Sequence, residues 1–280
     1  MNAKYHSAVF IDVDGTLVDR EGRMPESAIS VIAEAQQRGY MVVLTTGRMY
    51  ASAVREAGRA KIRSDIPVIS FNGAFCAPID NRLDVIHYTP VSGPLYVELI
   101  NLLSGSEQSD VTIFCYSLDS LFIDCENELL REYADRTGSN YKLLGSFLEI
   151  SSSPKVLILT RFETPQKLRP IYEKIDGAFK GRLEYVNSFP NYLEVNSPGT
   201  TKGAAIKSVI KRYSFDVKSL YAIGDSFNDV EMFSAVGTSI AMGNADVEVK
   251  KRALFSTKRL EDDGIAYAFK NFIFKTSRQF

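Results

Sequence analysis

The sequence predicts an α/β protein with a doubly wound parallel sheet, into which a smaller α+β domain is inserted. Short apolar runs alternate with amphipathic helical segments near both ends of the chain, whereas paired strands interrupt this alternation in the middle. At 280 residues, 45% hydrophobic and 24% charged, the chain can bury two cores and has an ordinary globular composition. We therefore expect two folded domains.

The first strand leads directly into two acidic residues. Ala8 to Ile11 is a continuous apolar run, which is typical of a strand buried on both faces, and Asp12, Asp14 and a Gly-Thr turn follow it. A buried strand does not tolerate unpaired carboxylates, so a metal or a reaction explains the acid pair better than packing does. A simple strand end remains an alternative at this point, because Asp-Gly is a common turn dipeptide.

Strands and helices continue to alternate through the first 82 residues. We expect helices at 25–38 and 49–58, and strands at 40–45 and 66–71. Right-handed crossovers between parallel strands gather their carboxyl ends at one edge of the sheet, where ligands bind. The polar residues that follow the second and third strands are Thr46, Gly47, Arg48 and Asn72.

The middle of the chain has a different order of elements. Strands at 111–116 and 121–124 flank a four-residue loop typical of a hairpin, which implies antiparallel pairing. Further helices are expected at 94–103, 126–137 and 165–175, and further strands at 155–161, 183–187 and 192–195. We expect residues 83–191 to form the inserted α+β domain, and residues 1–82 and 192–280 to form the α/β domain.

The alternating pattern then returns. We expect helices over 202–213, from 230 onward and over 260–280, and strands at 219–223 and 238–242. Lys202 begins the first of these helices, and Asp225, Asn228 and Asp229 follow the strand at 219–223. A lysine at a helix N-terminus is unfavourable against the helix dipole, which suggests a separate reason for Lys202 to be there.

Composition excludes several classes of partner. The net charge of −1 provides no overall field for nucleic acid or an anionic membrane, and no apolar run approaches the roughly 20 residues of a membrane span. Three cysteines without CxxC spacing argue against a disulfide framework or a structural zinc, and we expect no signal peptide because the N-terminus is polar. We expect a cytoplasmic protein, either a monomer or a small homo-oligomer.

The polar residues at the strand ends indicate metal-assisted phosphoryl transfer. Several carboxylates at one edge repel one another unless a cation lies between them, and ligands that are all oxygen favour Mg²⁺. One aspartate is then available to attack phosphorus, while Lys202 and Thr46 hold the phosphoryl oxygens. A second acid two residues further on can protonate the leaving oxygen and later deprotonate water.

Four stretches together resemble the motifs of the haloacid dehalogenase superfamily. They are Asp12-Val13-Asp14-Gly15-Thr16-Leu17, Thr46-Gly47-Arg48, Lys202-Gly203 and Gly224-Asp225-Ser226-Phe227-Asn228-Asp229. The insertion between the second and third motifs is similar to the large α/β cap of the Cof-type sugar-phosphatase subfamily. The resemblance implies a Rossmann-like core with a cap, Asp12 as nucleophile, Asp14 as general acid and base, and Thr46 and Lys202 as phosphoryl holders.

The resemblance also implies the metal and substrate contacts. Mg²⁺ is expected on the carboxylates of Asp12 and Asp225 and the backbone carbonyl of Asp14, with Asn228 and Asp229 close by. The expected substrate contacts are Thr46, Gly47, Arg48, Asn72, Lys202 and Asn228, with Arg48 facing the cap.

We therefore expect a Mg²⁺-dependent phosphatase that acts on a small phosphorylated metabolite through a phosphoaspartyl intermediate. A sugar phosphate is the first expectation, and a nucleotide or cofactor phosphate stays open. The alternatives are a phosphomutase, a phosphatase dedicated to one disaccharide phosphate and, of a different class, a non-catalytic phosphometabolite sensor.

Overall fold

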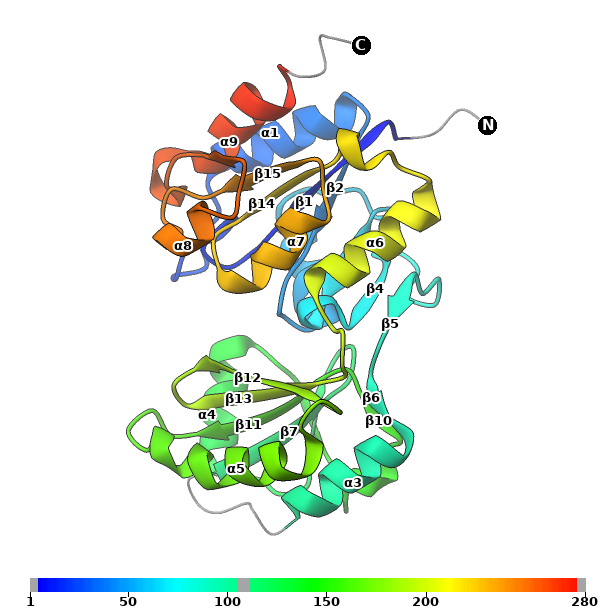
Figure 1. Cartoon of the computed structure of the whole chain (residues 1–280), viewed down its shortest axis with the longest axis vertical. Helices are drawn as coiled ribbons and strands as arrows, with labels where there is room; N and C mark the ends of the chain where they lie inside the picture. The colour runs from blue at the N-terminus through cyan, green and yellow to red at the C-terminus, as the bar shows by residue number, and fades with distance from the viewer. Residues whose placement is uncertain (1–4, 105–110, 276–280) are drawn as a thin grey trace. The chain divides into compact units, whose positions relative to one another are not determined.

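The computed structural model describes residues 5–104 and 111–275 and divides the chain into two compact units. One unit consists of Met1–His87 with Thr201–Phe280, and the other consists of Tyr88–Thr200 (Figure 1). The chain thus leaves the first unit, forms the second and returns, as expected of an insertion. The boundaries lie later than the expected ones after residues 82 and 191.

The first unit is built on a five-stranded parallel sheet in the order β16-β15-β14-β1-β2. Its strands are β1 (Ser7–Ile11), β2 (Tyr40–Leu44), β14 (Tyr221–Gly224), β15 (Thr238–Ala241) and β16 (Phe255–Ser256). β1 and β2 are buried at every position, which accounts for their unbroken apolar sequences. The central strand β1 pairs Ile11 with both Leu44 and Ile223, so three strands end side by side.

Helices cover both faces of this sheet, as a doubly wound fold requires. Figure 1 shows α1 and α9 on one face and α6 and α7 on the other. The helices of this unit are α1 (Glu26–Gln37), α2 (Tyr50–Arg59), α6 (Lys202–Tyr213), α7 (Val230–Ser234), α8 (Val247–Lys250) and α9 (Gly264–Ala268). The single helix expected over 260–280 is instead a 3₁₀ turn, α9 and a π-helical turn at Phe269–Ile273, and residues 276–280 lie outside the described range.

The third expected strand joins a different sheet. β3 (Pro67–Ser70) pairs antiparallel with β4 (Phe75–Pro78), and β5 (His87–Tyr88) follows β4 in that sheet. A 3₁₀ turn at Phe71–Gly73, in which Asn72 has φ of 55°, reverses the chain and makes this hairpin possible. One parallel bridge between Thr45 and Ile69 still holds the end of β3 beside β2. The polar ends of the two strands therefore remain neighbours.

The second unit contains a six-stranded sheet in the order β12-β13-β11-β7-β8-β9. Its strands are β7 (Val111–Tyr116), β8 (Leu121–Ile123), β9 (Tyr141–Leu143), β11 (Val156–Thr160), β12 (Glu184–Phe189) and β13 (Tyr192–Asn196), and a small sheet pairs β6 (Val91–Ser92) with β10 (Ser152–Ser153). The predicted hairpin of β7 and β8 is antiparallel as expected. β13 pairs with both β11 and β12, so the segment 192–200 belongs to this unit.

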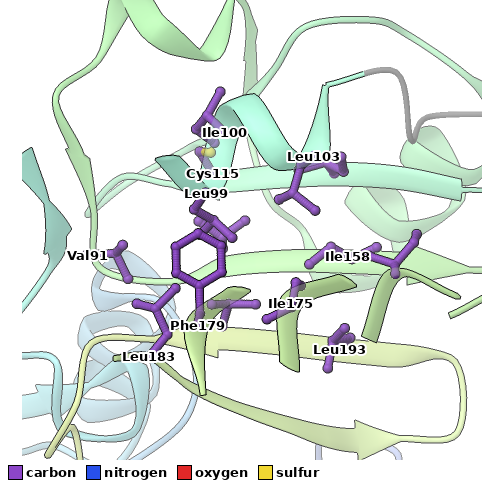
Figure 2. Close-up of a cluster of buried hydrophobic side chains, with 14 of the residues drawn as sticks. Val91, Leu99, Ile100, Leu103, Cys115, Ile158, Ile175, Phe179, Leu183 and Leu193 are labelled. Atoms are coloured by element: carbon purple, nitrogen blue, oxygen red, sulfur yellow. The ribbon is translucent and has the colours of Figure 1, made fainter. Parts of the chain in front are cut away.

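Two helices of the second unit pack on one side of its sheet. The helices of this unit are α3 (Gly93–Leu103), α4 (Glu128–Thr137) and α5 (Leu168–Phe179). Figure 2 shows the buried cluster that α3 and α5 form with the sheet, in which the Phe179 ring lies among Leu99, Ile175 and Leu183. Burying a side chain of this size stabilises a fold by about 1.5–3 kcal/mol. This burial also explains why α5 continues past Gly177, where the sequence predicts its end.

The described residues contain no helix of the length and apolar character that crossing a membrane requires. Cys76 and Cys115 are buried and Cys125 is exposed, and no disulfide joins these three residues.

Candidate functional site

The two acids after β1 lie in different surroundings. Asp12 continues the strand, since its N–H donates to the Ile223 carbonyl at 3.0 Å, and the residue is only 4% exposed. Asp14 lies in the following turn, and its side chain is 59% exposed. A buried carboxylate and an exposed one thus stand two residues apart, which gives them different chemical environments although their sequence context is alike.

Lys202 joins the first and last motifs in the interior of the first unit. Its Nζ donates to Asp12 Oδ1 at 2.5 Å and to Asp229 Oδ1 at 2.6 Å, and its side chain is fully buried. The hydroxyl of Thr201 caps the helix by accepting from the Ala204 N–H, so the lysine is fixed at the first residue of α6. These contacts supply the separate reason that the sequence suggested for a lysine at this helix start.

Asp229 and Asp225 shape the loop after β14. Asp229 Oδ2 accepts from the backbone N–H groups of Asp225 at 2.9 Å and Ser226 at 3.0 Å, which turns the chain sharply after Gly224. Asp225 Oδ1 in turn accepts from the Thr16 hydroxyl at 3.0 Å. Gly15 has φ of 83°, and a Cβ on it would lie 2.4 Å from Asp225 Oδ2, so only glycine permits this approach.

Asp12 and Asp225 hold their protons more tightly than free carboxylates do. Burial is the main reason that the pKa of Asp12 lies well above its usual value; Lys202 opposes the rise, while Asp229 and Asp225 add to it. Burial and the Asp229 charge raise the pKa of Asp225 to about 6. For Lys202, burial lowers the pKa, but the charges of Asp12 and Asp229 outweigh it and raise the pKa overall. One lysine does not balance three carboxylates.

Asp12, Asp225 and Asp229 form a donor set that fits a hard cation. One carboxylate oxygen from each residue lies within 4.8 Å of the others. All of these donors are oxygen, and the single buried lysine that contacts them carries less charge than three carboxylates, so Mg²⁺ suits the set in donor type and in charge. Both oxygens of Asp229 already accept hydrogen bonds, which makes Asp12 and Asp225 the better candidates for direct ligands.

A second group of polar residues spans the ends of β2, β3 and β14. The Thr46 carbonyl accepts from the Asn72 N–H at 3.0 Å, and Asn228 Nδ2 donates to Asn72 Oδ1 at 3.0 Å. A Cβ on Gly47 would lie 2.8 Å from Asn72 Oδ1, so glycine makes room for the amide. The structure therefore brings Thr46, Gly47, Asn72 and Asn228 together as neighbours.

Arg48 binds Asp14, a contact that the sequence did not predict. Its Nε and Nη2 donate to the two Asp14 oxygens at 2.9 and 2.6 Å, and its Nη1 donates to Glu56 Oε1 at 2.8 Å. Glu56 is also new to the site. A glutamate between Ala53 and Ala57 on the buried face of α2 was the available signal, since a charge there requires a partner.

Asn244 is another residue that sequence reasoning missed. Its Nδ2 donates to the Gly15 carbonyl at 2.8 Å, and its Oδ1 accepts from the Leu260 N–H at 3.1 Å. It thereby ties the turn after β1 to the loop after β15.

Comparison with known proteins identifies the family. Residues 9–269 match the profile of the haloacid dehalogenase-like hydrolases, which is nearly the whole chain. The chain belongs to this family. The resemblance drawn from the four motifs is thus confirmed, as is the α/β fold with a parallel sheet.

Relatives of this haloacid dehalogenase-like hydrolase are named as phosphatases. The putative phosphatase YkrA of Bacillus subtilis is 31% identical over 94% of this chain and 96% of its own. The 5-amino-6-(5-phospho-D-ribitylamino)uracil phosphatase YcsE of the same organism is 27% identical over 95% of each chain. The crystal structure of TM0651 from Thermotoga maritima superposes with a TM-score of 0.86 at 26% identity, covering 96% of this chain and 97% of that one. These matches support a hydrolase of the phosphatase type.

Proposed function

We propose that this protein is a Mg²⁺-dependent phosphatase that hydrolyses small phosphate monoesters through a phosphoaspartyl intermediate on Asp12. The observation that carries the proposal is the buried Lys202, which bridges Asp12 and Asp229 beside Asp225. One carboxylate is enough to neutralise one buried lysine, whereas Lys202 contacts two and a third lies beside them. Surplus carboxylates and a buried lysine together suit a site that binds a cation and a phosphoryl group.

Asp12 acts as the nucleophile in this mechanism. One carboxylate oxygen forms a bond to phosphorus while the bond from phosphorus to the leaving oxygen breaks, and a protonated Asp14 gives its proton to that oxygen. To carry this proton, one Asp14 oxygen releases its contact with Arg48 while the other keeps its own. Asp14 then takes a proton from water, which attacks the phosphoaspartate and restores the Asp12 carboxylate. Lys202 fixes Asp12 Oδ1, so the other oxygen is the one that we expect to attack.

The other polar residues hold the phosphoryl group and the metal. We expect Lys202 and the Thr46 hydroxyl to bind phosphoryl oxygens by charge and hydrogen bond, and Gly47, Asn72 and Asn228 to assist as the neighbours of Thr46. Asp12, Asp225 and the Asp14 carbonyl would hold Mg²⁺, and Asp229 would keep Lys202 and the loop in place. When bound, Mg²⁺ supplies positive charge against the phosphoryl oxygens.

The substrate class that we propose is a phosphorylated sugar or sugar-like polyol. YcsE, whose name specifies a phosphoribityl compound, is similar along nearly the whole chain. A separately folded insertion such as Tyr88–Thr200 is suited to act as a cap that contacts the leaving group, and we propose that role for it. Arg48 binds Asp14 in this structure, and its expected orientation toward a cap stays a prediction.

Binding of Mg²⁺ is expected to weaken in acid. Asp225 must lose its proton to bind the cation, and its pKa is about 6. The carboxylate is therefore available above that pH and is progressively protonated below it, so the apparent affinity should fall up to about tenfold for each further pH unit. Calorimetric titration of the protein with Mg²⁺ across this range measures the effect. An affinity that stays constant down to about pH 5 contradicts the assignment of Asp225 as a ligand.

The proposed activity is tested with a panel of phosphorylated metabolites, including hexose, pentitol, nucleotide and pyridoxal phosphates. Phosphate release is measured with Mg²⁺ and with a chelator. We expect release that depends on Mg²⁺ and is fastest with sugar or polyol phosphates. Transfer of the phosphoryl group to a second sugar would favour a phosphomutase, and Mg²⁺-dependent binding without turnover would favour a sensor.

A further inference from the structure

A chain of four alternating charges leads away from Asp14 into the first unit. Asp14 binds Arg48, Arg48 binds Glu56, and Glu56 Oε2 accepts from Arg59 Nη1 at 2.6 Å. Arg59 also donates to the Gly22 carbonyl at 2.7 Å. The chain therefore begins at the exposed acid after β1 and ends at the loop between β1 and α1.

Glu56 is the buried centre of this chain. Its side chain is 5% exposed, whereas those of Asp14, Arg48 and Arg59 are 59%, 24% and 43% exposed. Each of its oxygens accepts a hydrogen bond from a different arginine, so both oxygens of the carboxylate are held in place. Since a buried carboxylate with two ionic partners has little freedom to move, Glu56 is a rigid support for Arg48.

Arg48 transmits that support to Asp14. Two guanidinium nitrogens bind the two Asp14 oxygens, which fixes the plane of the carboxylate as well as its position. Without these two hydrogen bonds, the side chain of an exposed aspartate would rotate freely in solvent. The remaining guanidinium nitrogen of Arg48, Nη1, binds Glu56, so the orientation of Arg48 depends on Glu56.

We propose that Glu56 is a positioning residue for proton transfer: it holds Arg48, and through Arg48 it orients the Asp14 carboxylate. The inference rests on the proposed function, in which Asp14 gives a proton to the leaving oxygen. A displacement of about 1 Å can cost two orders of magnitude in rate, so a residue outside the reacting group can matter this much.

Two aryl phosphates of similar shape separate positioning from general damage. Phenyl phosphate needs a proton donor because phenolate is a poor leaving group, whereas 4-nitrophenolate leaves 4-nitrophenyl phosphate readily without one. The ratio kcat/KM reports the steps up to the first phosphoryl transfer, where the donor acts. For Glu56→Gln we expect a loss of about tenfold or more with phenyl phosphate and of less than about threefold with 4-nitrophenyl phosphate.

Two further variants make the test specific. In an Asp14→Asn background, Glu56→Gln should cause no additional loss with phenyl phosphate, because its effect passes through Asp14. Glu56→Asp keeps the negative charge but shortens the side chain that reaches Arg48. It should therefore also lose more activity with phenyl phosphate than with 4-nitrophenyl phosphate, and it replaces Glu56→Gln in the test if that variant fails to fold. Glu34→Gln removes the partner of Arg38 on the surface of α1 and serves as a matched control with unchanged kinetics.

Equal losses with both substrates in either Glu56 variant, or an additive loss in the Asp14→Asn background, would overturn the positioning role. Those results would leave the proposed function intact, because Asp12→Asn tests that separately. If the wild-type protein releases no phosphate from any ester, the proposed function itself fails.

Discussion

Replacing Asp12 by Asn is expected to lower kcat by about 10⁴-fold or more without unfolding the protein. Asparagine has nearly the same shape, and its amide oxygen can still accept from Lys202, but it cannot attack phosphorus as a carboxylate does. The change also removes one of the crowded buried acids, so the metal-free variant should melt at the wild-type temperature or above it. Steady-state phosphate release and thermal melting measure the two effects.

Asp246→Asn is a suitable control for this variant. Asp246 is exposed and caps α8 by accepting from the Glu248 N–H, a role that asparagine fills equally well. We expect its activity and melting temperature to match those of the wild type. Activity of Asp12→Asn within tenfold of wild type would exclude Asp12 as the nucleophile.

Lys202→Met is expected to abolish phosphate release and also to destabilise the first unit. The substitution leaves Asp12 and Asp229 buried without their common cation, and removing one partner of a buried pair typically costs about 3–5 kcal/mol. The pKa of Asp12 is already raised, and without Lys202 it rises further. Protonation of Asp12 relieves its repulsion with Asp229. The loss of unfolding free energy in the metal-free variant, relative to wild type, should therefore be smaller at about pH 5.5 than at about pH 8.

Chemical denaturation in the presence of a chelator, repeated at both pH values, measures this loss. Lys207→Met is the matched control, because Lys207 lies on the exposed face of the same helix. Added Mg²⁺ should recover part of the stability of Lys202→Met by supplying positive charge to the same carboxylates. If Lys202→Met were as stable as wild type at about pH 8, Lys202 would not be offsetting the negative charges of Asp12 and Asp229.

The sequence predicts the residues that meet in the site better than the contacts they make. Unbroken apolar runs predict buried strands such as β1 and β2, and the parallel topology then requires the polar residues at their carboxyl ends to share one edge of the sheet. Asp12, Asp225 and Asp229 are found together for that reason, and Lys202 joins them from the first residue of α6. The Arg48–Asp14 pair could not be predicted, because it depends on rotamers rather than on the position of either residue along its element.

The elements that differ from expectation have physical reasons of the same kind. The pairing of β3 with β4 depends on a reversal at Asn72 with a positive φ, which an asparagine permits but does not require. α5 runs through Gly177 because tertiary burial of Phe179 outweighs the low helix propensity of glycine. The boundary of the insertion moves to Thr200 because β13 pairs with β11 and β12, and long-range strand pairing is invisible in a local pattern.

The most direct test of the mechanism is to trap the phosphoryl group on the protein during a single turnover. The enzyme with Mg²⁺ is mixed with a stoichiometric amount of its best substrate, quenched within milliseconds in acid, and reduced with borohydride, which converts an acyl phosphate to an alcohol. Peptide mapping by mass spectrometry then locates the modified residue. Our account predicts conversion of Asp12 to homoserine, dependent on substrate and absent in Asp12→Asn. Stoichiometric phosphate release with Asp12 unmodified at every quench time would contradict it.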